Sequence, residues 1–128
     1  MFQALLLGNL FLQGIREYRE KFIQKFGAKC IFPIWGRNTG DLADFFIDSG
    51  FKAIICCVNP KLLGKEYCGR EFNKSFLSEL PKTVDPCGEN GEFHTFVYDG
   101  PVFHQRIDIR LGDIVNRDGF YFADILPA

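Results

Sequence analysis

The chain has 128 residues, enough for one domain or for a small domain with part of another. A hydrophobic share of 47% with 24% charged residues excludes an intrinsically disordered protein. The formal net charge of −1 provides no overall field that would attract nucleic acid or an anionic membrane, so neither is expected as a partner.

The aromatic and cysteine content indicates a compact protein with reduced thiols. Fifteen phenylalanines against one methionine predict a core built largely from rings. The five cysteines are odd in number and have no C-x-x-C spacing, which argues against a disulfide framework or a zinc ribbon. Residues 1–12 lack the basic start and the cleavage site of a signal peptide, and no segment reaches the ~20 apolar residues that span a bilayer. We therefore expect a cytoplasmic protein.

The first half of the chain alternates predicted strands and helices. A short apolar run at 4–7 predicts a strand, and helical spacing of apolar residues over 15–26 predicts a helix that Gly27 ends. A second strand is expected at 30–34 and a second helix at 39–50, where Gly50 stops it. The nearly continuous apolar run 51–58 predicts a third buried strand. This order is typical of a parallel α/β sheet with right-handed crossovers.

Parallel α/β sheets bind ligands beyond the carboxyl ends of their strands. In this sequence those ends are residues 8–9, 35–37 and 59–60. We expect these three points to form walls of one site.

The pattern changes after Pro60. Residues 61–82 contain a short helical pattern around Phe76, and residues 92–125 alternate in the manner of antiparallel strands. The segment 116–119 (Asn-Arg-Asp-Gly) has the composition of a hairpin turn. The sequence thus predicts two domains, 1–60 with a parallel sheet and 61–128 with a smaller α+β fold.

Residues 85–95 read DPCGENGEFHT and concentrate dissimilar polar groups just before an apolar run. The segment contains three carboxylates, a thiol, an imidazole, an amide and a hydroxyl, together with two glycines that allow tight backbone turns. A loop that serves only solubility is usually more repetitive, so this composition favours a shaped pocket.

Segments along almost the whole chain resemble one known family. The chain is similar to the diphthine–ammonia ligase family, also described as the diphthamide synthase domain of ATP-binding PP-loop proteins. The segments that carry the resemblance are 8–12, 16–19, 33–39, 50–53, 69–70, 85–100 and 119–127. The resemblance implies an enzyme that activates a carboxylate as its adenylate, with release of pyrophosphate from ATP. Ammonia then forms the amide, and AMP leaves.

The family's glycine-rich S-G-G-x-D-S loop, which holds the ATP phosphates, does not occur in these residues. The chain therefore resembles the C-terminal portion of such an enzyme, and the fold expected is an incomplete Rossmann-like sheet (PP-loop, adenine nucleotide alpha hydrolase-like) over 1–60, followed by a substrate-binding α+β domain over 61–128. ATP and Mg²⁺ are expected only with the missing half. The implied partners are ammonia and a carboxylate acceptor, which is elongation factor 2 if the source is archaeal or eukaryotic.

Glu89, Glu92 and His94 are the predicted catalytic residues. An attacking ammonium must lose a proton, and a carboxylate with a raised pKa can accept it. The alternatives are that both carboxylates bind backbone amides and that His94 is a packed, hydrogen-bonded side chain.

The other predicted site residues bind substrate or nucleotide. Gly8 and Asn9 are expected to contact the cofactor, although the family more often has Asp at the position of Asn9. Arg37 and Arg70 are expected to bind a phosphate or a carboxylate. The alternative is that each forms a salt bridge that braces its loop. No metal site is expected, since Cys87 and His94 lack a recognisable fourth ligand. The predicted substrate-binding residues are Trp35, Gly36, Arg37, Arg70, Cys87, Gly88, Asn90, Thr95 and Tyr98.

Two rival functions stay open at this point. The chain is alternatively a non-catalytic module from a truncated gene that binds a ligand or partner, or a hydrolase or transferase with Cys87 as its nucleophile. An unpaired sheet edge at 4–7 would also favour self-association.

Overall fold

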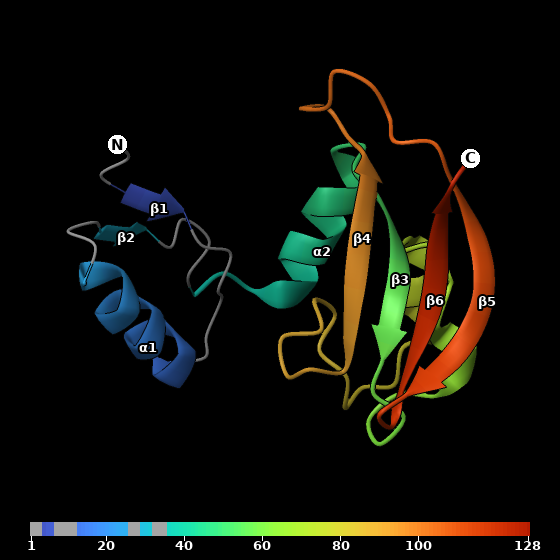
Figure 1. Cartoon of the computed structure of the whole chain (residues 1–128), viewed down its shortest axis with the longest axis horizontal. Coiled ribbons are helices and arrows are strands. Elements are labelled where there is room, and N and C mark those ends of the chain that lie inside the picture. Colours follow the sequence, from blue (N-terminus) through green and yellow to red (C-terminus); the bar gives the residue numbers. More distant parts are fainter. Residues whose placement is uncertain (1–3, 7–12, 26–28, 32–35) are drawn as a thin grey trace. The chain divides into compact units, whose positions relative to one another are not determined.

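The computed structural model describes residues 4–6, 13–25, 29–31 and 36–128. The chain divides into two compact units, Met1–Thr39 and Gly40–Ala128. In the first unit, strand β1 (Ala4–Leu6) pairs in parallel with strand β2 (Lys29–Ile31), and helix α1 (Gln13–Gln24) connects them (Figure 1). This strand–helix–strand order with parallel pairing confirms the local prediction for this segment.

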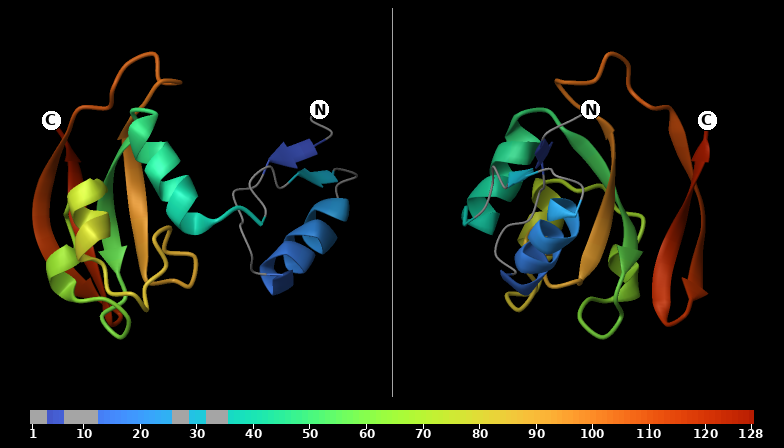
Figure 2. Two further views of the ribbon diagram at one scale, coloured as in Figure 1. Left: turned by 180° about the vertical axis from the view of Figure 1, so that it is seen from behind. Right: turned by 60° about the vertical axis from the view of Figure 1, so that its left-hand side comes forward.

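The second unit is a four-stranded antiparallel sheet with helices packed on it (Figures 1 and 2). The sheet has the order β4-β3-β6-β5. The elements in chain order are helix α2 (Thr39–Asp48), β3 (Lys52–Val58), the 3₁₀ turn η1 (Lys65–Tyr67), helix α3 (Lys74–Glu79), β4 (Phe93–Asp99), β5 (Ile109–Arg117) and β6 (Phe120–Pro127). No helix among these described elements is long and apolar enough to cross a membrane.

The prediction that 51–58 is a third strand of the parallel sheet is wrong. Strand β3 runs antiparallel to β4, where Ile55 lies opposite Thr95, and antiparallel to β6, where Val58 lies opposite Tyr121. A continuous apolar run indicates that a strand is buried on both faces, but it does not tell the direction of the neighbours. Along the chain, the division between the two compact units falls at Thr39/Gly40, and β3 lies in one sheet with β4, β5 and β6.

One edge of β3 is shared by two partners. The segment 69–72 bonds to the first half of the strand, through Gly69 N–H to Ile55 O (2.7 Å) and Phe72 N–H to Ala53 O (2.8 Å). Strand β6 pairs only with the last two residues of β3. The β5–β6 hairpin is thus attached to the rest of the sheet mainly at its turn end.

The turn of that hairpin has the geometry that its residues favour. Arg117 pairs with Phe120, and the two residues between them both have positive φ, 53° at Asp118 and 86° at Gly119. A two-residue turn with both φ values positive is type I′, which matches the right-handed twist of the strands. The predicted hairpin is therefore confirmed.

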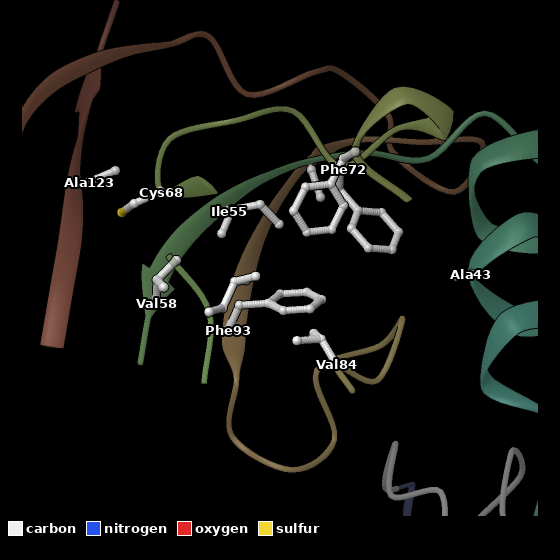
Figure 3. Packing of buried hydrophobic residues seen from close by; sticks show 11 residues of the cluster. Ala43, Ile55, Val58, Cys68, Phe72, Val84, Phe93 and Ala123 are labelled. Atoms are coloured by element: carbon white, nitrogen blue, oxygen red, sulfur yellow. The ribbon is translucent and has the colours of Figure 1, made fainter. Parts of the chain in front are cut away.

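The core lies between the sheet and the helices and is built largely from rings. Phe76 is fully buried, and its ring centroid lies 5.6 Å from that of Phe72 and 5.4 Å from that of Phe93. Asn73 Oδ1 accepts the Phe76 N–H (2.9 Å), which starts α3 where its side chain reaches this cluster. Figure 3 shows Phe72 and Phe93 pointing into the same interior as Ile55. This ring cluster holds the start of β4 in place.

We expect Phe76→Ala to lower the free energy of unfolding by about 3–5 kcal/mol, because the substitution leaves a cavity that the surrounding packed rings fill only in part. Urea denaturation of the 128-residue chain, followed by circular dichroism, measures the change. The matched control is Phe120→Ala, whose side chain is 40% exposed and should lose no more than about 1 kcal/mol. Equal losses in the two variants would contradict the assignment of the core.

Candidate functional site

The polar segment predicted from the sequence forms a tight loop, residues 85–92, which we call the polar loop. It leads directly into β4 at Phe93 (Figure 1). Gly88 and Gly91 have φ values of 65° and 81°, a region that other residues rarely adopt. A Cβ atom at Gly88 would lie 2.6 Å from the Phe93 carbonyl oxygen, so only glycine lets the loop return this closely to the strand.

Glu92 is the buried anchor of the polar loop. Its side chain is 2% exposed, and each carboxylate oxygen accepts a backbone N–H: Oε2 from Asp85 (2.6 Å) and Oε1 from Asn90 (2.8 Å). Among the described residues, no buried side-chain nitrogen or oxygen is left without a hydrogen bond. The structure thus gives Glu92 the amide-binding role that the sequence left as the alternative to chemistry.

Asp85 organises the opposite part of the loop. Its Oδ2 accepts the N–H groups of Cys87 (2.9 Å) and Glu89 (3.3 Å), and its carbonyl accepts that of Gly88 (2.9 Å). Asp85 was not among the predicted site residues. The signal that finds it is an aspartate at the start of a turn, because such a side chain often bonds to the backbone two residues on.

The end of β3 lies beside the polar loop. The Asn59 N–H donates to the Glu92 carbonyl (3.0 Å), and Asn59 Oδ1 accepts the Lys61 N–H (3.1 Å). The predicted wall at 59–60 is therefore adjacent to the loop.

The other two predicted walls belong to the first part of the chain. Gly8, Asn9 and Trp35 lie outside the described residues. Gly36 has a φ of 77°, and Arg37 is exposed. Both belong to the first compact unit.

His94 and Thr95 follow the polar loop as the second and third residues of β4. Both side chains are exposed. His94 lies opposite Cys57 and Thr95 lies opposite Ile55 in the antiparallel pair with β3. The two residues therefore present polar groups next to the loop.

Tyr98 is not brought together with the polar loop. It lies five residues along β4 from Phe93, which at ~3.3 Å per residue is roughly 17 Å. Its hydroxyl donates to the Glu71 carboxylate, and burial together with this hydrogen bond raises the pKa of Tyr98 to about 12. The Arg106 guanidinium lies 5.3 Å from the centroid of the Tyr98 ring. These contacts form a separate cluster at the far end of the strand.

Arg70 also has structural partners away from the polar loop. Its guanidinium forms an ion pair with Glu79 and lies 5.6 Å and 5.8 Å from the ring centroids of Tyr67 and Phe76. The Tyr67 hydroxyl donates to the Glu79 carbonyl (2.8 Å), so the same contacts connect η1 to the end of α3. This arrangement corresponds to the bracing role that the sequence left as the alternative for this arginine.

The Cys87 thiol is half-buried and disfavours its ionised form. Burial raises the pKa of Cys87 to about 12, and the nearby carboxylates of Asp85 and Glu89 add to the shift. The thiolate is the nucleophilic form of cysteine. These surroundings are the opposite of the electropositive sites in which catalytic cysteines occur.

A groove of about 340 Å³ lies beside the polar loop. Its apolar wall comes from α3 and the segment that leads into the loop, and it reaches the loop at Pro86. Asp44 on its rim accepts a hydrogen bond from Lys74 Nζ (2.8 Å). Within the described part of the chain, no group of three His, Cys, Asp or Glu side chains is placed to hold a metal ion. The groove is lined by Gly40, Asp44, Leu77, Leu80, Pro81, Lys82, Val84 and Pro86.

Comparison with known proteins identifies relatives over most of the chain. The family described as "Diphthamide synthase C-terminal domain" matches residues 38–125, which include the polar loop. The diphthine–ammonia ligase of Bos taurus is 33% identical over 128 residues, covering 96% of this chain and 48% of that protein. That of Mus musculus is 37% identical over 114 residues, covering 83% of this chain and 42% of the relative. The chain thus spans about half the length of these two relatives.

We expect Glu92→Gln to lower the free energy of unfolding by about 2–3 kcal/mol, because an amide NH₂ would replace one acceptor oxygen and face a buried backbone N–H. Chemical denaturation measures the loss. The control is Glu66→Gln on the exposed side of η1, which should change stability by no more than about 0.5 kcal/mol. A Glu92→Gln variant as stable as this control would contradict the anchoring role.

We expect the Cys87 thiol to react with iodoacetamide about a hundredfold or more slowly at pH 8 than a cysteine in an unstructured peptide. Because the pKa of Cys87 is raised to about 12, the rate should keep increasing above pH 10. Mass spectrometry of the Cys87 peptide separates its labelling from that of the other cysteines. A rate that levels off below pH 8 would instead support a nucleophilic Cys87.

Proposed function

The chain belongs to the diphthamide synthase C-terminal domain family, and from this premise we propose that it is the acceptor-binding half of an ATP-dependent, AMP-forming amide ligase. The observation that carries the proposal is that the family match over 38–125 contains the whole polar loop, with its buried carboxylate and strained glycines. The relatives are named diphthine–ammonia ligases. The proposed reaction is accordingly diphthine, ammonia and ATP giving diphthamide, AMP and pyrophosphate.

The chemistry proceeds in two steps. An oxygen of the acceptor carboxylate attacks the α-phosphorus of ATP, and pyrophosphate leaves. The nitrogen of ammonia then attacks the acyl carbon, AMP leaves, and the nitrogen gives up a proton as the amide forms. A base held close to the nitrogen accelerates this second step, because the proton must leave as the C–N bond is made.

We assign the base to Glu89. Of the two predicted glutamates, Glu92 uses both oxygens to hold backbone amides inside the protein, whereas Glu89 is half-buried at the surface of the loop. Glu92 then serves by fixing the loop. His94 and Thr95, exposed on the adjoining β4, contact the acceptor or relay the proton onward.

The loop and the neighbouring groove together suit an acceptor that is part of a larger molecule. The reacting carboxylate would enter beside Cys87, Gly88 and Asn90, and the flanking part would lie against the apolar wall that ends at Pro86. In an archaeal or eukaryotic cell the acceptor would be elongation factor 2, which also requires a cytoplasmic location.

ATP is proposed to bind to another segment, in the same polypeptide or in a separate one. These 128 residues hold no S-G-G-x-D-S loop and no three-ligand metal cluster within the described part. Mg²⁺ would arrive with ATP and offset the charge on its phosphates. The parallel pair β1–β2 suits the edge of a Rossmann-like nucleotide-binding sheet. Gly8 and Asn9 are proposed to contact the nucleotide, and Trp35, Gly36 and Arg37 are proposed to contact the acceptor.

The same lack of a phosphate-binding loop also favours a second candidate. In that case the chain is a non-catalytic module that binds the acceptor without turning it over. The two candidates differ in whether the chain supports AMP release when an ATP-binding half is supplied.

We expect the chain to support ATP-dependent amide formation only when it is combined with an ATP-binding half. The chain is mixed with the separately expressed part of the Bos taurus relative that this chain does not cover. AMP release is followed with ATP, ammonium and diphthine-bearing elongation factor 2. Turnover should need every component. Glu89→Gln should reduce the rate at least about 100-fold, because it removes the base, while Glu66→Gln should not.

The full-length Bos taurus ligase serves as the positive control. If it is active while the mixture binds the acceptor but releases no AMP, the non-catalytic module is the better description. A Glu89→Gln variant with full turnover would remove Glu89 from the proposed mechanism and leave the ligase assignment intact.

A further inference from the structure

We infer that Asp85 is a positioning residue that holds Glu89 at the place where it acts as the base, an inference that rests on the proposed function. Asp85 Oδ2 accepts the Glu89 N–H (3.3 Å) and the Cys87 N–H (2.9 Å). Two amides on one oxygen fix the direction of the backbone from 87 to 89. The Glu89 side chain is attached to the Cα atom that is bonded to this amide nitrogen.

The carboxylate of Asp85 forms hydrogen bonds with backbone N–H groups of the polar loop. Two amide donors point at its Oδ2, which lies inside the turn. A base must reach the proton of the attacking nitrogen within hydrogen-bond distance. Asp85 therefore affects the reaction by orienting Glu89.

Two further bonds attach the loop near Asp85, and both use its backbone. The Asp85 N–H donates to Glu92 Oε2 (2.6 Å), and the Asp85 carbonyl accepts the Gly88 N–H (2.9 Å). Neither bond depends on the identity of the side chain. A substitution at Asp85 thus removes the grip on Cys87 and Glu89 while the attachment to the buried Glu92 remains, so positioning and folding can be tested separately.

Three variants isolate this role. Asp85→Ala removes the acceptor for both amides. Asp85→Asn keeps a side-chain oxygen that accepts them and removes the charge. Asp99→Ala is the matched control: Asp99 Oδ1 also accepts the N–H of a turn residue, Gly100 (2.8 Å), but it lies at the opposite end of β4 from the polar loop.

Steady-state kinetics of the reconstituted ligase tests the inference. We expect Asp85→Ala to lower kcat about 100-fold, the size of effect that a misplacement of about 1 Å produces, with the KM for the acceptor changed far less. Asp85→Asn should recover most of that kcat, and Asp99→Ala should keep all of it. Melting temperatures of the variants show whether each is folded during the assay.

Amide hydrogen exchange provides a readout that does not need turnover. Asp85→Ala should accelerate exchange at the Glu89 N–H, and Asp85→Asn should leave it close to the original rate. A protein without any AMP release would overturn the proposed function, and exchange at Glu89 would still decide whether Asp85 holds that residue.

Three results would overturn the inference itself. One is a folded Asp85→Ala variant with the original kcat, another is an Asp85→Asn variant as slow as Asp85→Ala, and the third is exchange at Glu89 that is equal in all variants.

Discussion

The buried carboxylate of Glu92 is the interaction on which the polar loop depends. A charged group that is 2% exposed would normally be costly, and it makes no ion pair with any other described residue. Two backbone N–H groups, from Asp85 and Asn90, compensate for the lost water. Because those donors come from opposite parts of the loop, one side chain closes the turn and leaves Glu89 at its surface.

The sheet places this loop through contacts that are far apart in the sequence. Strand β3 is central, with β4 on one edge and both the segment 69–72 and β6 on the other. Its end at Asn59 meets the Glu92 carbonyl, and the ring of Phe93 packs into the core immediately after the loop. The loop is therefore held where it contacts the end of β3 and where it enters β4. These contacts give the loop the rigidity that a binding site needs.

Sequence patterns indicated where the candidate site lies, but they did not decide the role of each of its residues. The mixed polar composition of 85–95 pointed to the loop. The strand end at 59–60, which was expected to form a wall of a site, lies beside this loop. The roles of the two glutamates were open because Glu89 and Glu92 differ in burial, and burial is decided by how the loop packs on Phe93. Tyr98 lies at the other end of β4 from the loop, because a strand is extended and separates residues that are only a few positions apart in the sequence.

Local chemistry was determined by the sequence alone, and long-range order only by the tertiary structure. The type I′ turn at Asp118–Gly119, the start of α3 at Asn73 and the glycine at 88 follow from neighbours within a few residues, which a sequence displays directly. The direction of β3 and the burial of Glu92 depend on partners tens of residues or a whole loop away. The sequence of an apolar run does not show whether its neighbouring strands are parallel or antiparallel, and the sequence around a carboxylate does not show whether it is buried. Packing decided both.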